Sequence, residues 1–192
     1  MVGMGSNRYM LYLKNRTFSP KDVNLLISRA RSLLRGQEAI VRDTRVSSQH
    51  IEYDISLAAN EDLKLIESKL SVIGNFIEVY PVIEREYGKK QAILIAIKYF
   101  NEEKYWSAHE VLEGVWKKSV EEEKTLLNGL ILVAAAFVHY QKDESKIALG
   151  IMSRAMEKLR VSSGEYYKIN IDYLKLNINN ILSSNCLFII KL

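Results

Sequence analysis

The sequence predicts an α+β protein, with a ferredoxin-like βαββαβ domain at residues 1–82 and an all-α helical bundle at residues 83–192. Two observations support this prediction. Up to Tyr80, short runs of alternating apolar and polar residues are separated by two helical stripes, and from Lys89 onward the apolar residues recur at helical spacing. The chain has 192 residues, 48% of them hydrophobic, and a single cysteine, Cys186, so it buries its cores without disulfides.

The elements of the first domain follow from capping and turn signals. Ser19 precedes Pro20, and serine at the N-cap with proline at the first helical position is a common helix start. We expect, in order, a strand at 8–14, a helix at 19–36, a hairpin of strands at 39–47 and 50–57, a helix at 60–72 and a strand at 76–80. The right-handed crossover rule then gives an antiparallel sheet with both helices on one face.

The other face of this sheet is expected to expose Glu52, Asp54 and Ser56, since side chains alternate along a strand. Acidic side chains repel phosphate, so this face disfavours nucleic acid as a partner. His50, in the hairpin turn, is also expected to be exposed. Residues 1–46 are basic nevertheless, with nine Lys or Arg against three acidic residues, which is typical of a solvated basic surface.

The second half of the chain is expected to be entirely helical. We predict helices at 89–100, from Asn101 to about 119, at 124–141, from Asp143 or Ser145 to 159, and at 171–182. The third is apolar on every side and should lie at the centre of the bundle. Its longest apolar run has nine residues, short of the roughly 20 needed to cross a membrane. With no secretory signal pattern at the N-terminus, the sequence predicts a cytoplasmic protein.

A motif in the second of these helices carries the most specific signal. The helix reads Tyr105-Trp106-Ser107-Ala108-His109-Glu110-Val111-Leu112-Glu113-Gly114-Val115-Trp116, preceded by Tyr99-Phe100-Asn101 and followed by Asn128-Gly129-Leu130-Ile131 and Ala134-Ala135-Ala136-Phe137-Val138-His139. With these residues, the region from about 89 to 160 resembles the domain of unknown function 309 family. The resemblance implies a small all-helical fold and no established activity. The chain departs from the family at Ser107, where an acidic residue is usual, and at Asn128, where glutamine is usual.

Helix geometry places several polar residues of the motif near one another. At about 100° per residue, His109 lies on the core side of its helix and Glu113 follows one turn later, with Glu110 further round. Asn128 and His139 share one stripe of the next helix, so these residues can line a polar seam between the two helices. Tyr105, Trp106 and Trp116 are expected in the core, with Tyr105, Trp116 and Asn128 as the candidates for contacting a ligand.

Three interpretations of the seam remain open. His109 and Glu113 can form a buried structural pair. His109, Glu113 and His139 can instead provide three ligands for a divalent metal ion, although their spacing is neither that of the zinc proteases nor that of di-iron proteins. General acid–base catalysis without a metal is the third, with candidates His109, Glu110, Glu113 and His139.

The leading hypothesis is therefore a cytoplasmic binding or regulatory module with a polar His/Glu seam, which can hold a small-molecule ligand. The alternative is a metal-dependent hydrolase in which Glu110 acts as base, so the sequence leaves open whether the protein is an enzyme. Self-association, most simply as a homodimer, is expected from the open edge strands of the sheet and from the apolar segment Leu187–Ile190. No contact with a membrane is expected.

Overall fold

The computed structural model describes residues 7–83 and 85–192. The chain divides into two compact units. One holds the residues up to Arg85 together with Gln141–Asp143, and the other holds Glu86–Tyr140 and Glu144–Leu192. The fold is α+β, with an antiparallel four-stranded sheet in the N-terminal unit and a helical region after it.

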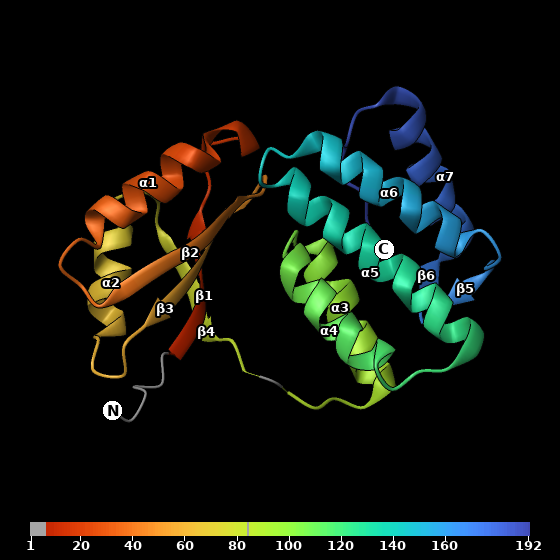
Figure 1. Ribbon diagram of the computed structural model, residues 1–192, viewed down its shortest axis with the longest axis horizontal. Helices are drawn as coiled ribbons and strands as arrows, with labels where there is room; N and C mark the ends of the chain where they lie inside the picture. The colour runs from red at the N-terminus through yellow and green to blue at the C-terminus, as the bar shows by residue number, and fades with distance from the viewer. Residues whose placement is uncertain (1–6, 84) are drawn as a thin grey trace. The chain divides into compact units, whose positions relative to one another are not determined.

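The sheet of the N-terminal unit has the strand order β2-β3-β1-β4. The elements are β1 (Asn7–Lys14), a 3-10 turn η1 (Pro20–Asp22), α1 (Val23–Leu33), β2 (Ala39–Val46), β3 (His50–Leu57), α2 (Leu63–Leu70) and β4 (Phe76–Pro81). In the central pair, Leu11 of β1 lies opposite Tyr53 of β3. Figure 1 shows α1 and α2 packed beside these strands. Alternate strand residues and the apolar stripes of both helices form one core.

The expectation that Glu52, Asp54 and Ser56 are exposed is wrong, because all three are buried. Their polar groups are matched within the sheet: Arg8 binds Asp54, and Arg45 binds Glu52. His50 is also buried rather than exposed: it is the first residue of β3, and its ring and that of Tyr12 form a T-shaped pair with 5.0 Å between centroids.

The second unit is mainly helical, with α3 (Lys89–Asn101), α4 (Tyr105–Trp116), α5 (Glu121–Tyr140), α6 (Ser145–Leu159) and α7 (Ile171–Ser184). The expectation of an all-α domain is wrong in one detail, because β5 (Glu165–Tyr166) and β6 (Ile169–Asn170) form a short hairpin between α6 and α7. The helix predicted to start at Asn101 begins instead at Tyr105, after a turn in which Glu103 has φ 60°. The third helix begins at Glu121 rather than near Lys124.

Helix α5 packs against both α4 and α6. Its buried residues lie on more than one side, among them Leu127, Leu130, Ala134 and Phe137, and they join a core that continues through all the helices of the unit. Gly129 allows a close approach to α6, because a Cβ atom at this position would lie 2.7 Å from Cγ of Leu159.

The C-terminal segment packs on its own unit. Leu187 and Ile190 are buried in the helical core, so the expectation that this segment is available for pairing is wrong for these two residues. The Asn101 side chain fixes the end of the segment, donating to the carbonyl of Leu192 at 3.0 Å and accepting from its amide at 2.8 Å.

Candidate functional site

Helix α4 presents His109, Glu110 and Glu113 at the polar edge of its surface. The opposite edge anchors the helix through Tyr105, Ala108, Leu112 and Val115, all buried in the core. The three polar side chains are partly open to solvent, with side-chain exposures of 27% for His109, 47% for Glu110 and 36% for Glu113. A rigid helix thus carries side chains that keep some rotational freedom.

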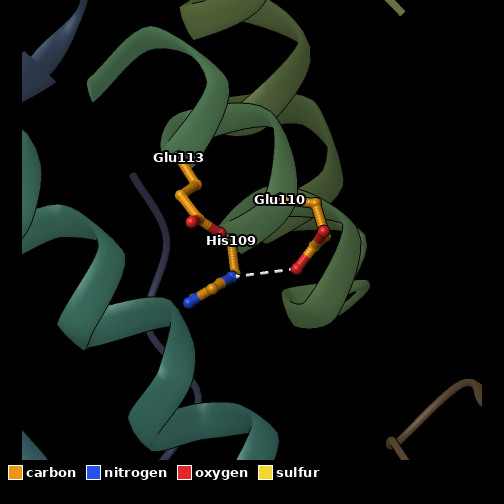
Figure 2. A group of neighbouring side chains, drawn as sticks. All are labelled: His109, Glu110 and Glu113. Carbon is orange, nitrogen blue, oxygen red and sulfur yellow. Dashed lines mark hydrogen bonds and ion pairs between the residues drawn. The ribbon is translucent and has the colours of Figure 1, made fainter. Parts of the chain in front are cut away.

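The donor atoms of these three residues form a compact group. One ring nitrogen and one oxygen from each carboxylate all lie within 4.8 Å of one another. Figure 2 shows both carboxylates directed toward the imidazole, one on each side. His109 Nδ1 lies 3.3 Å from Glu110 Oε1, which is longer than the usual hydrogen-bond distance. Glu113 also reaches Lys117, one turn later, at 3.4 Å.

The partner of the His109 imidazole is therefore Glu110, whereas helix spacing had favoured Glu113. Both carboxylates are within reach of the ring from the same helix, so the side-chain torsions decide between them. The set combines one imidazole nitrogen and two carboxylate oxygens. Imidazole and carboxylate ligands together suit zinc, iron and manganese.

His139 lies apart from this group. Its Nδ1 is 2.5 Å from Oε2 of Glu144, and the backbone amide of Glu144 donates to the carbonyl of His139 at 3.0 Å. In the described part of the chain, the group of potential metal ligands contains His109, Glu110 and Glu113 but not His139. Sequence reasoning missed Glu144 because it lies beyond the end of α5, where helical periodicity no longer relates the two positions.

The candidate ligand-contacting residues have different surroundings. Tyr105 is a core residue, as expected, and its ring stacks on Phe137 with 4.7 Å between centroids. Burial, together with the nearby Glu103 and Tyr140, raises the pKa of Tyr105. Trp116 is half-buried against the core, and the Lys124 ammonium lies 4.8 Å from its ring centroid. Asn128 is half-buried on α5.

A second polar group in the helical unit was not foreseen. Glu123 receives hydrogen bonds from Lys89 at 2.8 Å and from the Tyr166 hydroxyl at 2.9 Å. These contacts join α3, α5 and the short hairpin. The Lys89 hydrogen bond is the main cause that lowers the pKa of Glu123, and burial raises the pKa of Tyr166. The group therefore holds these elements of the helical unit together.

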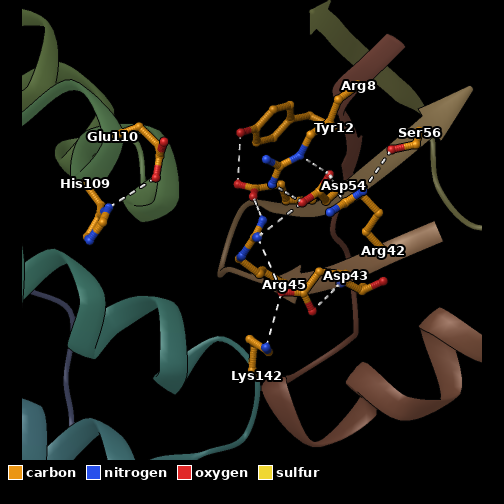
Figure 3. A network of polar contacts seen from close by, with 12 residues as sticks. Arg8, Tyr12, Arg42, Asp43, Arg45, Asp54, Ser56, His109, Glu110 and Lys142 are labelled. Carbon is orange, nitrogen blue, oxygen red and sulfur yellow. Dashed lines mark hydrogen bonds and ion pairs between the residues drawn. The ribbon is translucent and has the colours of Figure 1, made fainter. Parts of the chain in front are cut away.

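The N-terminal sheet carries a third network, shown in Figure 3. Arg8 binds Asp54 through two hydrogen bonds, of 2.8 and 2.6 Å. Arg45 binds Glu52, which also accepts from the Tyr12 hydroxyl at 2.9 Å. Arg45 belongs to the basic segment 1–46 that was expected to form a solvated surface, but it is buried and engaged by carboxylates of its own sheet.

Comparison with known proteins identifies the motif-bearing part of the chain. Residues 93–151 match the family described as a domain of unknown function, DUF309. The matched segment contains α4 with His109, Glu110 and Glu113, and it confirms the resemblance seen in the sequence. No curated protein matches the chain. In the described residues, no helix has the length and apolar character needed to cross a membrane.

Proposed function

We propose that the protein is a binding module whose helical unit holds a divalent metal ion through His109, Glu110 and Glu113. The observation that carries the proposal is the grouping of three donor atoms within 4.8 Å. Around a tetrahedral ion with bonds of about 2.0–2.2 Å, neighbouring ligand atoms are about 3.3–3.6 Å apart. The three side chains are partly exposed, so rotation about their side-chain bonds can change the spacing of the donors.

The charge of the group supports a divalent ion. Two carboxylates and a neutral imidazole supply two negative charges, which a divalent cation neutralises. Three protein ligands leave at least one coordination position for water or for a small ligand. Lys117 competes with an ion for Glu113, but its ion pair with Glu113 is long and exposed, so it is weak.

The alternative, a metal-dependent hydrolase, would use His139 as a metal ligand and Glu110 as base. Both residues are otherwise engaged in the arrangement described above: His139 faces Glu144, and Glu110 faces His109. The donor group therefore supports binding better than hydrolysis.

We further infer a ferredoxin-like topology for the N-terminal unit. The strand order β2-β3-β1-β4, the antiparallel pairing of all neighbours, and helices that connect β1 to β2 and β3 to β4 support this inference. The strands β2 and β4 are its open edges, and they support the proposal that the protein self-associates.

The metal proposal is tested on the purified full chain. We expect about one Co²⁺ or Zn²⁺ per chain, with visible absorption from bound Co²⁺ that Zn²⁺ displaces. Removing a group that only supports a metal ligand costs about 10- to 100-fold in affinity, so His109→Ala, Glu110→Gln and Glu113→Gln, which alter the ligands themselves, should each weaken binding by at least that factor. Glu122→Gln, at an exposed position on α5, is the matched control. Less than about a tenth of an ion per chain after metal-replete expression, with no Co²⁺ spectrum, would refute the proposal.

A further inference from the structure

The end of the helical unit carries an uncharged surface that the metal proposal does not use. Residues 176–190, from the middle of α7 onward, contain no charged side chain, although 26% of the residues in the chain are charged. Nine of these fifteen residues are exposed: Leu176, Asn179, Asn180, Ser183, Ser184, Asn185, Cys186, Phe188 and Ile189. Burial accounts for an uncharged run inside a core, but it does not account for one on the surface.

Four exposed residues of α7 form a seam on the side of the helix that faces away from the core. Their spacing of i, i+3, i+7 and i+10 is that of the a and d positions of a coiled coil: Tyr173, Leu176, Asn180 and Ser183. Tyr173 is 58% exposed and Leu176 is 55% exposed. The seam thus has the spacing that packs one helix against another, with two large apolar side chains at one end.

The asparagines of this face are poor choices for a solvated helix. Asn179 and Asn180 are exposed in the middle of α7. Asparagine has a lower helix propensity than lysine, glutamate or arginine, which are the usual residues at outer positions of a surface helix. In a coiled coil, by contrast, an asparagine at an a position specifies the register and the number of helices that associate. The Asn180 amide therefore suits a seam that packs against a second helix.

The absence of charge selects the partner. A charged residue close to a two-fold axis lies near its own copy and is repelled by it, so a face without charges suits self-association. Contact with a different protein has no such constraint and gains specificity from complementary charges. A helix that lies on a membrane is rich in lysine and arginine on its polar face. The one basic residue of α7, Lys175, instead pairs with Asp172 of the same helix at 3.0 Å.

The open edges of the sheet are less suited to this contact than α7. The register of β2 shifts between Val41 and Asp43, and that of β4 shifts opposite Tyr12 and Leu13. Such bulges are among the features that keep an edge strand from pairing with another chain.

We propose that the chain forms a homodimer through α7, with the seams of two copies packed together about a two-fold axis. This inference rests on the self-association proposed above and names its surface. The second copy covers Tyr173 and Leu176, and the Asn180 amide, which both donates and accepts, pairs with a polar group of the other seam. Helix α7 has 14 residues and is about 21 Å long, so the interface is small and the dimer dissociates in the micromolar range.

Sedimentation velocity of the full chain tests the surface, in EDTA so that the outcome is independent of the metal proposal. We expect a dimer whose fraction rises with concentration between about 1 and 200 µM. Leu176→Glu and Leu176→Lys should each weaken it about tenfold or more, because like charges then face each other across the axis. An equimolar mixture of the two variants should form more dimer than either variant alone, since opposite charges then meet. Leu176 is exposed, so the circular dichroism of both variants should be unchanged.

Ile147→Glu, at an exposed position on α6, and Ile77→Glu, on the edge strand β4, are the matched controls and should leave the dimer unchanged. A dimer that persists in Leu176→Glu, or that is lost in Ile77→Glu, would overturn this inference and leave self-association standing. A chain that stays monomeric throughout the concentration range would overturn both. Binding of the monomer to phosphatidylcholine vesicles, if it were lost in Leu176→Glu, would assign the face to a membrane and also overturn the inference.

Discussion

Replacement of Gly129 by alanine tests the close packing of α5 on α6. The added Cβ would lie 2.7 Å from both Cγ and Cδ2 of Leu159, whereas carbon atoms in contact are about 3.5–4.0 Å apart. Leu159 is fully buried, so its whole side chain must move into an already filled core. Such overpacking costs about 1–3 kcal/mol, and alanine recovers about 1 kcal/mol through its higher helix propensity. Because the side chain moves as a unit, we expect a net loss of about 1–2 kcal/mol.

The measurement is urea unfolding followed by tryptophan fluorescence. Both tryptophans of the chain, Trp106 and Trp116, lie on α4, so the signal reports the helical unit. Gly150→Ala is the matched control, because Gly150 is exposed in α6 and a Cβ atom there meets nothing within 4 Å. This control should stabilise the unit by about 0.5–1 kcal/mol.

A double-mutant cycle assigns the loss to its cause. With Leu159→Ala in the background, the clash is removed, and Gly129→Ala should become neutral or stabilising. The reasoning is refuted if Gly129→Ala alone stabilises the unit as much as Gly150→Ala does, since α5 and α6 would then not be in close contact at this point.

Three further predictions concern polar contacts of the helical unit. His109→Leu should change the unfolding free energy by less than about 1 kcal/mol, because the contact of the imidazole with Glu110 is long and exposed, and the variant should no longer bind Co²⁺. A fall in the unfolding free energy of more than about 3 kcal/mol would show that His109 is a structural residue. Lys89→Met should shift acid unfolding to higher pH. Lys89 lowers the pKa of Glu123 in the folded state, so the ionised carboxylate stabilises the fold above its unfolded pKa, and this stabilisation is lost as the pH falls through the folded pKa. An acid transition in circular dichroism at the same pH as in the unaltered chain would contradict the prediction. Asn101→Ala should speed carboxypeptidase release of the C-terminal residues, and rates equal to those of the unaltered chain would show that the two backbone contacts do not hold the segment.

The sequence alone was sufficient where structure depends on near neighbours. Alternation predicted the strands, and the Ser19-Pro20 signal predicted where the first helical segment begins, since both depend on a few adjacent residues. The candidate metal site was predicted only in part, because the sequence analysis named His109 and Glu113 as metal ligands but chose His139 as the third ligand and gave Glu110 the role of a base. His109, Glu110 and Glu113 lie within two turns of one helix, so helix geometry alone brings them together.

Only the tertiary structure decided the contacts between distant residues. The ion pair of Arg8 with Asp54 depends on strand register, and the pairing of His139 with Glu144 depends on the turn after α5. The contacts of Glu123 with Lys89 and Tyr166 need three elements to be packed first. Long polar side chains reach several partners at similar energies, so residue type and spacing do not select among them. The fixed backbone makes that selection, by bringing some of these partners within hydrogen-bonding distance and holding the others apart.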